Sequence, residues 1–275
     1  MKRRSLADFS SWAEIFSAKV NRGELLPWSD GYVLTDAERT RITTSIQQFE
    51  LGENAEGRSF RAAAARYAER SGDWEYLRAL QLFIKEEQRH SSYLRRFMNA
   101  QQIPCAEGHW VDDTFRWMRK RAGLELFIVV LVSAELVARP YYRALKAATG
   151  SPLLRAICKE ILRDEADHLC FQGNALRKLR QGRGRTAAGV VELLQIVLMV
   201  GTCVVVWGSH QQVLRSGGYT LRSFTRECIS GIIWLNRLAS KPLTGARPQP
   251  EVEQRRSGHG MKGSGIKAHP ARVGG

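Results

Sequence analysis

Two short segments, Glu86-Glu87-Gln88-Arg89-His90 and Asp164-Glu165-Ala166-Asp167-His168, decide the fold of this 275-residue chain. Both carry the pattern acid-acid-x-x-His, and they follow Gly72 and Gly150 at the same distance along the chain. A repeat of this kind predicts two similar helical hairpins related by approximate two-fold symmetry.

The Glu-x-x-His spacing has a direct geometric consequence on a helix. Residues i and i+3 lie on the same face, with Cβ atoms roughly 5 to 6 Å apart. Glu87 with His90, and Glu165 with His168, can therefore each present one oxygen and one nitrogen to a metal ion. Two such pairs, joined by one carboxylate from each of two other helices, make a ligand set that suits two ions of iron or manganese.

The two single carboxylates are expected one helix upstream of each Glu-x-x-His pair. Glu135 lies in an apolar stretch, where a charge is costly unless a metal, or Arg139 or Arg121, neutralises it. In the first helix, Glu56 precedes Gly72 by almost the same number of residues as Glu135 precedes Gly150. Glu53 lies one turn earlier on the same face of that helix. The sequence does not separate these two, so both are candidates.

Four further side chains are expected around the ligands. Glu86 and Asp164 each precede a histidine by four residues, and metal-bound imidazoles usually donate their other N–H to a carboxylate, carbonyl or water. Tyr67 and Tyr142 are expected to hydrogen-bond the ligand carboxylates or to line the cavity. No catalytic residue is expected beyond the metal centre.

The two segments resemble the E-E-x-R-H and D-E-x-x-H segments of the ferritin-like diiron superfamily, which includes ferritins, rubrerythrins, acyl-carrier-protein desaturases and N-oxygenases. The resemblance covers about residues 40 to 180. It implies an all-α, ferritin-like four-helix bundle that holds two iron ions, or manganese, or a mixed manganese–iron pair. Pro140 within the third helix and the long apolar segment after the fourth depart from the family's pattern. The implied ligands are Glu87, His90, Glu135, Glu165, His168 and Glu53 or Glu56.

The chain divides by composition into four regions. We expect residues 1–34 to form an N-terminal extension with a short helix, and 35–180 to form the dimetal four-helix bundle that the resemblance implies. Residues 181–240 add one or two apolar C-terminal helices, and 241–275, rich in Gly and Pro, form a basic tail that we expect to be disordered. Within these regions, helices are predicted over 5–20, 35–70, 74–100, 114–148, 152–180, 186–208 and 217–240.

The net charge of +15 is spread over many helices, and no nucleic-acid motif accompanies it, so we do not expect nucleic-acid binding. The five cysteines form no C-x-x-C pair, which argues against a disulfide framework or a zinc site and favours the cytoplasm. His109 and His210 have no partners at ligand spacing and are expected to be ordinary surface or loop residues, while His259 and His269 lie in the tail.

The segment 187–208 contains one charged residue, Glu192, and is as long as a membrane-spanning helix needs to be. Two interpretations compete. It covers the bundle or makes a homodimer contact, or it attaches the protein to a membrane. We favour the first because Glu192 and Gln195 lie within the segment.

The expected activity is that of an oxygen-activating oxidase or oxygenase, with dioxygen and a small apolar or aromatic molecule as substrates. Electrons would come from a separate donor protein, because the chain has no Rossmann glycine motif and no iron–sulfur cysteine set. The alternative is a ferroxidase, an iron-handling protein or an oxidative-stress protein with the same metal centre. A third interpretation keeps the fold with a purely structural or lost site.

Overall fold

The protein is all-α. The computed structural model describes residues 8–20, 26–54, 57–106, 123–181 and 185–240, all within the compact unit Met1–Lys241, and these residues contain no strand. Glu56, His109, Arg121 and the basic tail lie outside the described residues.

The described helices follow the predicted order, with differences at three places. One helix was expected over 35–70, and the structure describes two, on either side of residues 55–56. The start predicted for the third helix, near residue 114, lies outside the described residues. The predicted end of the apolar helix near residue 208 is wrong, because this helix continues until Gly217 and Gly218, where Gly218 takes a φ of 80°. The helices are α1 Phe9–Val20, α2 Asp36–Asn54, α3 Gly57–Ser71, α4 Trp74–Ala100, α6 Leu124–Ala148, α7 Pro152–Leu179, α8 Arg185–Ser216 and α9 Leu221–Ala239.

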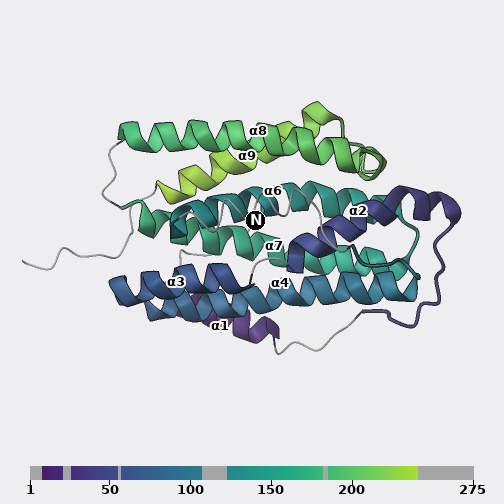
Figure 1. Cartoon of the computed structure of the whole chain (residues 1–275), viewed down its shortest axis with the longest axis horizontal. Helices are drawn as coiled ribbons and strands as arrows, with labels where there is room; N and C mark the ends of the chain where they lie inside the picture. Colours follow the sequence, from purple (N-terminus) through teal and green to yellow (C-terminus); the bar gives the residue numbers. More distant parts are fainter. Residues whose placement is uncertain (1–7, 21–25, 55–56, 107–122, 182–184, 241–275) are drawn as a thin grey trace, which may run out of the picture. The chain divides into compact units, whose positions relative to one another are not determined.

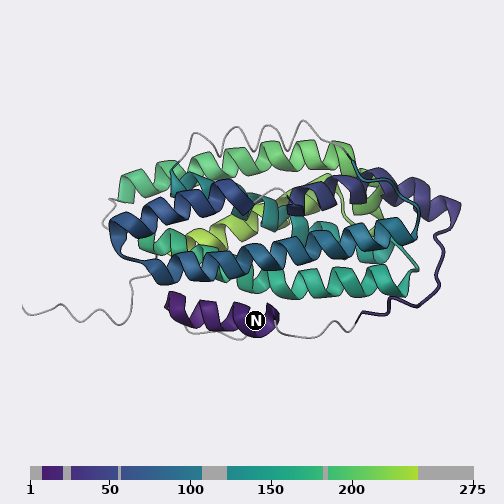
Figure 2. The same ribbon diagram turned by 60° about the horizontal axis from the view of Figure 1, so that its bottom comes forward.

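The helices that carry the candidate ligands are neighbours. The two Glu-x-x-His helices, α4 and α7, pack against each other, α6 packs against α7, and α2 contacts both α4 and α6. Figure 1 shows α8 and α9 on one side of α6 and α7, and α4 on the other. Helix α1 lies along α4, as the turned view in Figure 2 makes clear.

Local side-chain contacts define the starts of α2 and α7. At the start of α2, the Thr35 N–H donates to Glu38 Oε2 at 2.9 Å, and the Glu38 N–H donates to Thr35 Oγ1 at 3.3 Å. This reciprocal pair is a capping box, and it satisfies two amides that a helix start leaves without partners. Helix α7 begins with Pro152 after Ser151, whose hydroxyl accepts from the Leu154 N–H.

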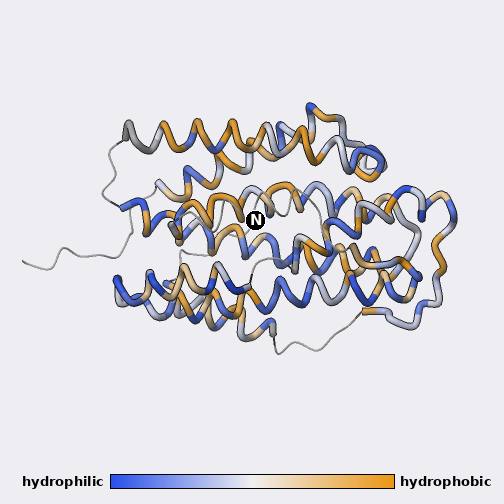
Figure 3. The backbone as a smooth tube through the Cα atoms, in the orientation of Figure 1, coloured by the Kyte–Doolittle hydropathy of each residue, from blue (hydrophilic) through white to orange (hydrophobic). Residues whose placement is uncertain are grey.

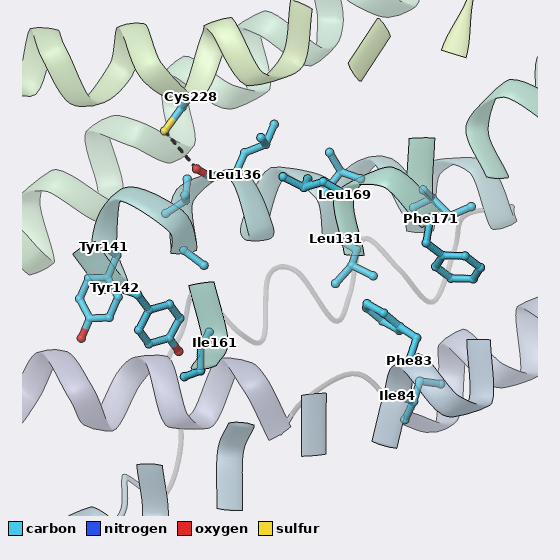
Figure 4. Packing of buried hydrophobic residues seen from close by; sticks show 14 of the residues in the cluster. Phe83, Ile84, Leu131, Leu136, Tyr141, Tyr142, Ile161, Leu169, Phe171 and Cys228 are labelled. Atoms are coloured by element: carbon cyan, nitrogen blue, oxygen red, sulfur yellow. Dashed lines mark hydrogen bonds between the residues drawn. The ribbon is translucent and has the colours of Figure 1, made fainter. Parts of the chain in front are cut away.

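Pro140 lies inside α6, which continues through it to Ala148. Because proline has no N–H, the carbonyl of Leu136 loses its donor within the helix. The Cys228 thiol of α9 donates to that carbonyl with an S–O distance of 3.6 Å (Figure 4). Gly231, one turn along α9, lets the two helices approach closely, since a Cβ there would collide with the Leu136 side chain.

Candidate metal centre

Six of the predicted ligands meet inside the protein. They come from the end of α2, the middle of α4, the middle of α6 and the middle of α7, and each is at least 92 % buried. Ligand atoms of Glu53, His90 and Glu165 lie within 4.8 Å of one another, and so do those of Glu87, Glu165 and His168. Glu165 belongs to both groups, so the structure presents two adjoining sets of metal-ligating atoms that share a carboxylate.

The two imidazoles are held in the same way, by carboxylates of the opposite helix. Nε2 of His90 lies 3.2 Å from Oδ2 of Asp164, and Nε2 of His168 lies 2.9 Å from Oε2 of Glu86. A carboxylate partner keeps the proton on Nε2, which leaves Nδ1 as the free lone pair. Both Nδ1 atoms face the carboxylate cluster.

Several polar atoms in this cluster have no hydrogen-bond partner among the described residues. They include both Glu135 oxygens. The imidazole Nδ1 atoms face carboxylates instead: Nδ1 of His168 lies 2.9 Å from Glu87 Oε1, and Nδ1 of His90 lies 3.7 Å from Glu53 Oε2. The predicted alternative, a Glu135 side chain neutralised by Arg139, is not seen, and Arg121 lies outside the described residues. Buried polar atoms without partners are costly, and the ones here are lone-pair donors facing one another. Together with the histidines, they could hold a metal ion.

The electrostatics of the carboxylates point the same way. Burial, followed by the charge of Glu165, raises the pKa of Glu135 well above its usual 4.5. Burial also raises the pKa of Glu165 to about 8, with Glu87 and Glu53 adding repulsion and the histidines opposing it. Without a cation, these carboxylates cannot all carry a charge at low cost.

Basic side chains neutralise the outer carboxylates. Lys19 Nζ of α1 lies 3.0 Å from Asp164 Oδ1 and from Asp167 Oδ2, and 3.4 Å from Glu86 Oε2. Arg89 Nη2 lies 2.9 Å from the other oxygen of Asp164. Burial opposes the charge of Lys19, but the surrounding carboxylates raise its pKa above 10.5. Sequence reasoning assigned no role to Lys19, because nothing in the local spacing of α1 relates it to a residue far along the chain.

The two tyrosines named from the sequence behave differently. Tyr142 of α6 donates its hydroxyl hydrogen to Glu53 Oε1 at 2.5 Å, and this contact orients the α2 carboxylate. Tyr67 packs its ring on Tyr76, with centroids 5.7 Å apart, and makes no hydrogen bond to the cluster among the described residues.

The prediction for His210 is wrong. It was expected to be an ordinary surface or loop residue, but it is buried and its Nδ1 lies 2.8 Å from Ser45 Oγ. Its ring also packs against Phe49 and Tyr141. The expectation failed because α8 packs against α2, and the sequence does not predict this long-range contact. His210 is not part of either group of candidate ligands.

No family model matches the chain, and no curated protein or solved structure matches it either. An all-helical protein with a buried cluster of acidic and histidine side chains is compatible with a ferritin-like fold.

Proposed function

We propose that the chain is a ferritin-like diiron-carboxylate protein in which α4, α6, α7 and the α2–α3 segment form the four-helix bundle. The observation that carries this proposal is the pair of adjoining ligand groups that share Glu165. Glu53, Glu135, Glu87 and Glu165 would supply the carboxylates, and Nδ1 of His90 and of His168 the two nitrogens. This is the ligand chemistry of two iron ions, with manganese or a mixed pair as the other fitting metals.

The proposed reaction is oxygen-dependent oxidation of a small organic substrate. Two reduced irons held by Glu53, Glu87, His90, Glu135, Glu165 and His168 would supply electrons for dioxygen reduction, and a separate donor protein would replace those electrons. The chain's own residues hold the site. Glu86 and Asp164 accept the imidazole N–H groups, and Tyr142 holds the Glu53 carboxylate. Buried aromatic and aliphatic side chains, among them Phe83 and Ile161 in Figure 4, exclude water from around the polar cluster.

Metal analysis tests the proposal. Protein folded with ferrous ion under anaerobic conditions should retain about two irons per chain. A Glu87→Ala, Glu165→Ala double variant should retain fewer than half of them. The matched control is Glu75→Ala with Glu160→Ala, which removes two carboxylates from the outer surfaces of the same helices, α4 and α7. Native protein that stays free of metal under these conditions would exclude the proposed function.

An oxygen pulse separates the oxidase or oxygenase from the alternative ferroxidase. Loaded protein of the first kind consumes oxygen in step with an organic substrate and keeps its iron. A ferroxidase turns over added ferrous ion without an organic substrate and releases or mineralises the ferric product. The basic character of the chain disfavours the second, because a net charge of +15 does not help to gather cations.

A further inference from the structure

Helix α8 presents a continuous apolar face to the outside of the described unit. Val190, Leu193, Leu194, Val197 and Val204 are each 55 to 62 % exposed. Their spacing of mainly three and four residues places them on one side of the helix. Figure 3 shows that much of α8 between its grey start and its more polar last turns is coloured apolar, and Gly189–Ser216 is long and apolar enough to cross a membrane. A patch of this extent is uncommon on a soluble monomer and marks an interaction surface.

The opposite face of α8 is packed against the protein. Met199, Cys203, Val213 and Leu214 are fully buried, and α8 contacts α2, α6 and α9. In the most apolar stretch of α8, only 17 % of the residues are buried. Because α8 is packed against its neighbours from Gln195 to Leu214, its apolar face is suited to lie on a surface rather than to cross a bilayer alone.

The apolar surface continues onto α9 and gains positive charge there. A hollow of about 760 Å³ between the two helices is lined by Val200, Val204, Leu221 and Ile229, together with Arg222 and Arg226. Both arginines are exposed, and neither forms an ion pair within the described part of the chain. Their spacing of four residues places them on the same face of α9.

Further side chains suited to a membrane–water interface lie near the C-terminal end of the apolar face of α8. The Arg215 guanidinium lies 5.8 Å from the centre of the Trp207 ring, and both residues follow Val204 on α8. Tryptophan and basic residues are typical of the level where a bilayer's apolar interior meets its headgroups. The described part of α8 offers one acidic residue, Glu192, so the α8 face of a second copy of the chain would bring few carboxylates to the arginines. A layer of anionic headgroups presents net negative charge to both guanidinium groups.

We propose that the outward face of α8, with Arg222 and Arg226 of α9 at its edge, docks the protein onto an anionic lipid bilayer. Helix α8 lies in the plane of the surface, with its valine and leucine side chains inserted below the headgroups. The protein is attached to the membrane and does not span it. This inference is independent of the metal centre, since none of the candidate ligands lies on α8 or α9.

Vesicle flotation with the full-length chain tests the proposal. The native protein should float with vesicles of phosphatidylcholine containing about one third phosphatidylserine, and more weakly with phosphatidylcholine alone. Arg222→Gln with Arg226→Gln should lower the partition coefficient for anionic vesicles by up to about 25-fold, because each basic residue near such a surface contributes a factor of about 5. Leu193→Asp with Val197→Asp should abolish flotation.

The matched control is Val33→Asp with Trp74→Asp, which changes two exposed apolar residues outside α8 and α9 and should float like the native chain. Circular dichroism must show that every variant is folded. Native protein that stays with the soluble fraction would overturn the proposal, as would equal flotation of the Leu193, Val197 variant. A native dimer that this variant converts to a monomer, with no vesicle binding, would instead assign the face to a second copy of the chain.

Discussion

Nε2 of His168 on α7 lies 2.9 Å from Oε2 of Glu86 on α4, and the reverse contact joins His90 on α4 to Asp164 on α7. Each Glu-x-x-His helix therefore supplies a carboxylate that holds the histidine of the other. The crossed pair fixes both imidazole tautomers and ties together the two helices that supply most of the ligands.

Removing one of these carboxylates should weaken metal binding without removing a ligand. We expect Glu86→Ala to lower the affinity for ferrous or manganous ion by about 10- to 100-fold, because the His168 ring loses its orienting partner. Glu86→Gln, which keeps an acceptor oxygen, should have a smaller effect. Competition with a chelating dye measures both. Glu75→Ala, an exposed substitution on the same helix, is the control, and an equal affinity for Glu86→Ala and the native chain would contradict the assigned role.

Lys19 should stabilise the protein through the carboxylates that hold the histidines. In Lys19→Met, the carboxylates of Glu86, Asp164 and Asp167 lose a shared cation, and we expect the free energy of unfolding to fall by about 3 kcal/mol. Urea denaturation of the metal-free protein measures this. Lys178→Met is the control, since its ion pair with Asp73 is partly exposed and should contribute about 1 kcal/mol or less. Similar losses in the two variants would show that the Lys19 contacts contribute no more than a surface pair.

Glu135 should destabilise the metal-free protein. Its carboxylate is buried beside other carboxylates and has no hydrogen-bond partner among the described residues. Replacing it with leucine removes this cost, and we expect Glu135→Leu to raise the free energy of unfolding by about 1 to 4 kcal/mol in the presence of a chelator. The same variant should lose bound iron. Ala134→Leu, at an exposed position of α6, is the control, and a destabilised, iron-loaded Glu135→Leu protein would refute the assignment.

Glu38 should make stability depend on acid pH. Burial opposes its charge, but hydrogen bonds from the Gly150 and Thr35 N–H groups and from two hydroxyls lower its pKa to about 2 from 4.5. Because the folded-state pKa is the lower one, the contribution is complete above pH 4.5 and disappears as the pH falls toward 2. Glu38→Gln should therefore cost about 1 to 3 kcal/mol near neutral pH and almost nothing near pH 2. Urea denaturation at several pH values checks this, and a constant difference would count against it.

Local order along the chain was predictable because it depends on neighbouring residues. The capping box at Thr35 and Glu38 and the Ser151-Pro152 helix start are contacts within one turn, and the structure shows both. The Glu-x-x-His pairs are also local, since a helix by itself places Glu87 beside His90. The end of α8 was misjudged because Gly208 does not break a helix that is packed on one side.

The sequence by itself determined the helical class, the two Glu-x-x-His segments and the acidic residues near them, because helix geometry follows from short-range spacing. Only the tertiary structure decided which helix holds which histidine, that Lys19 neutralises their partners, that His210 is buried, and which face of α8 is left exposed. These depend on contacts between residues far apart in the chain, and such contacts are set by the packing of whole helices against one another.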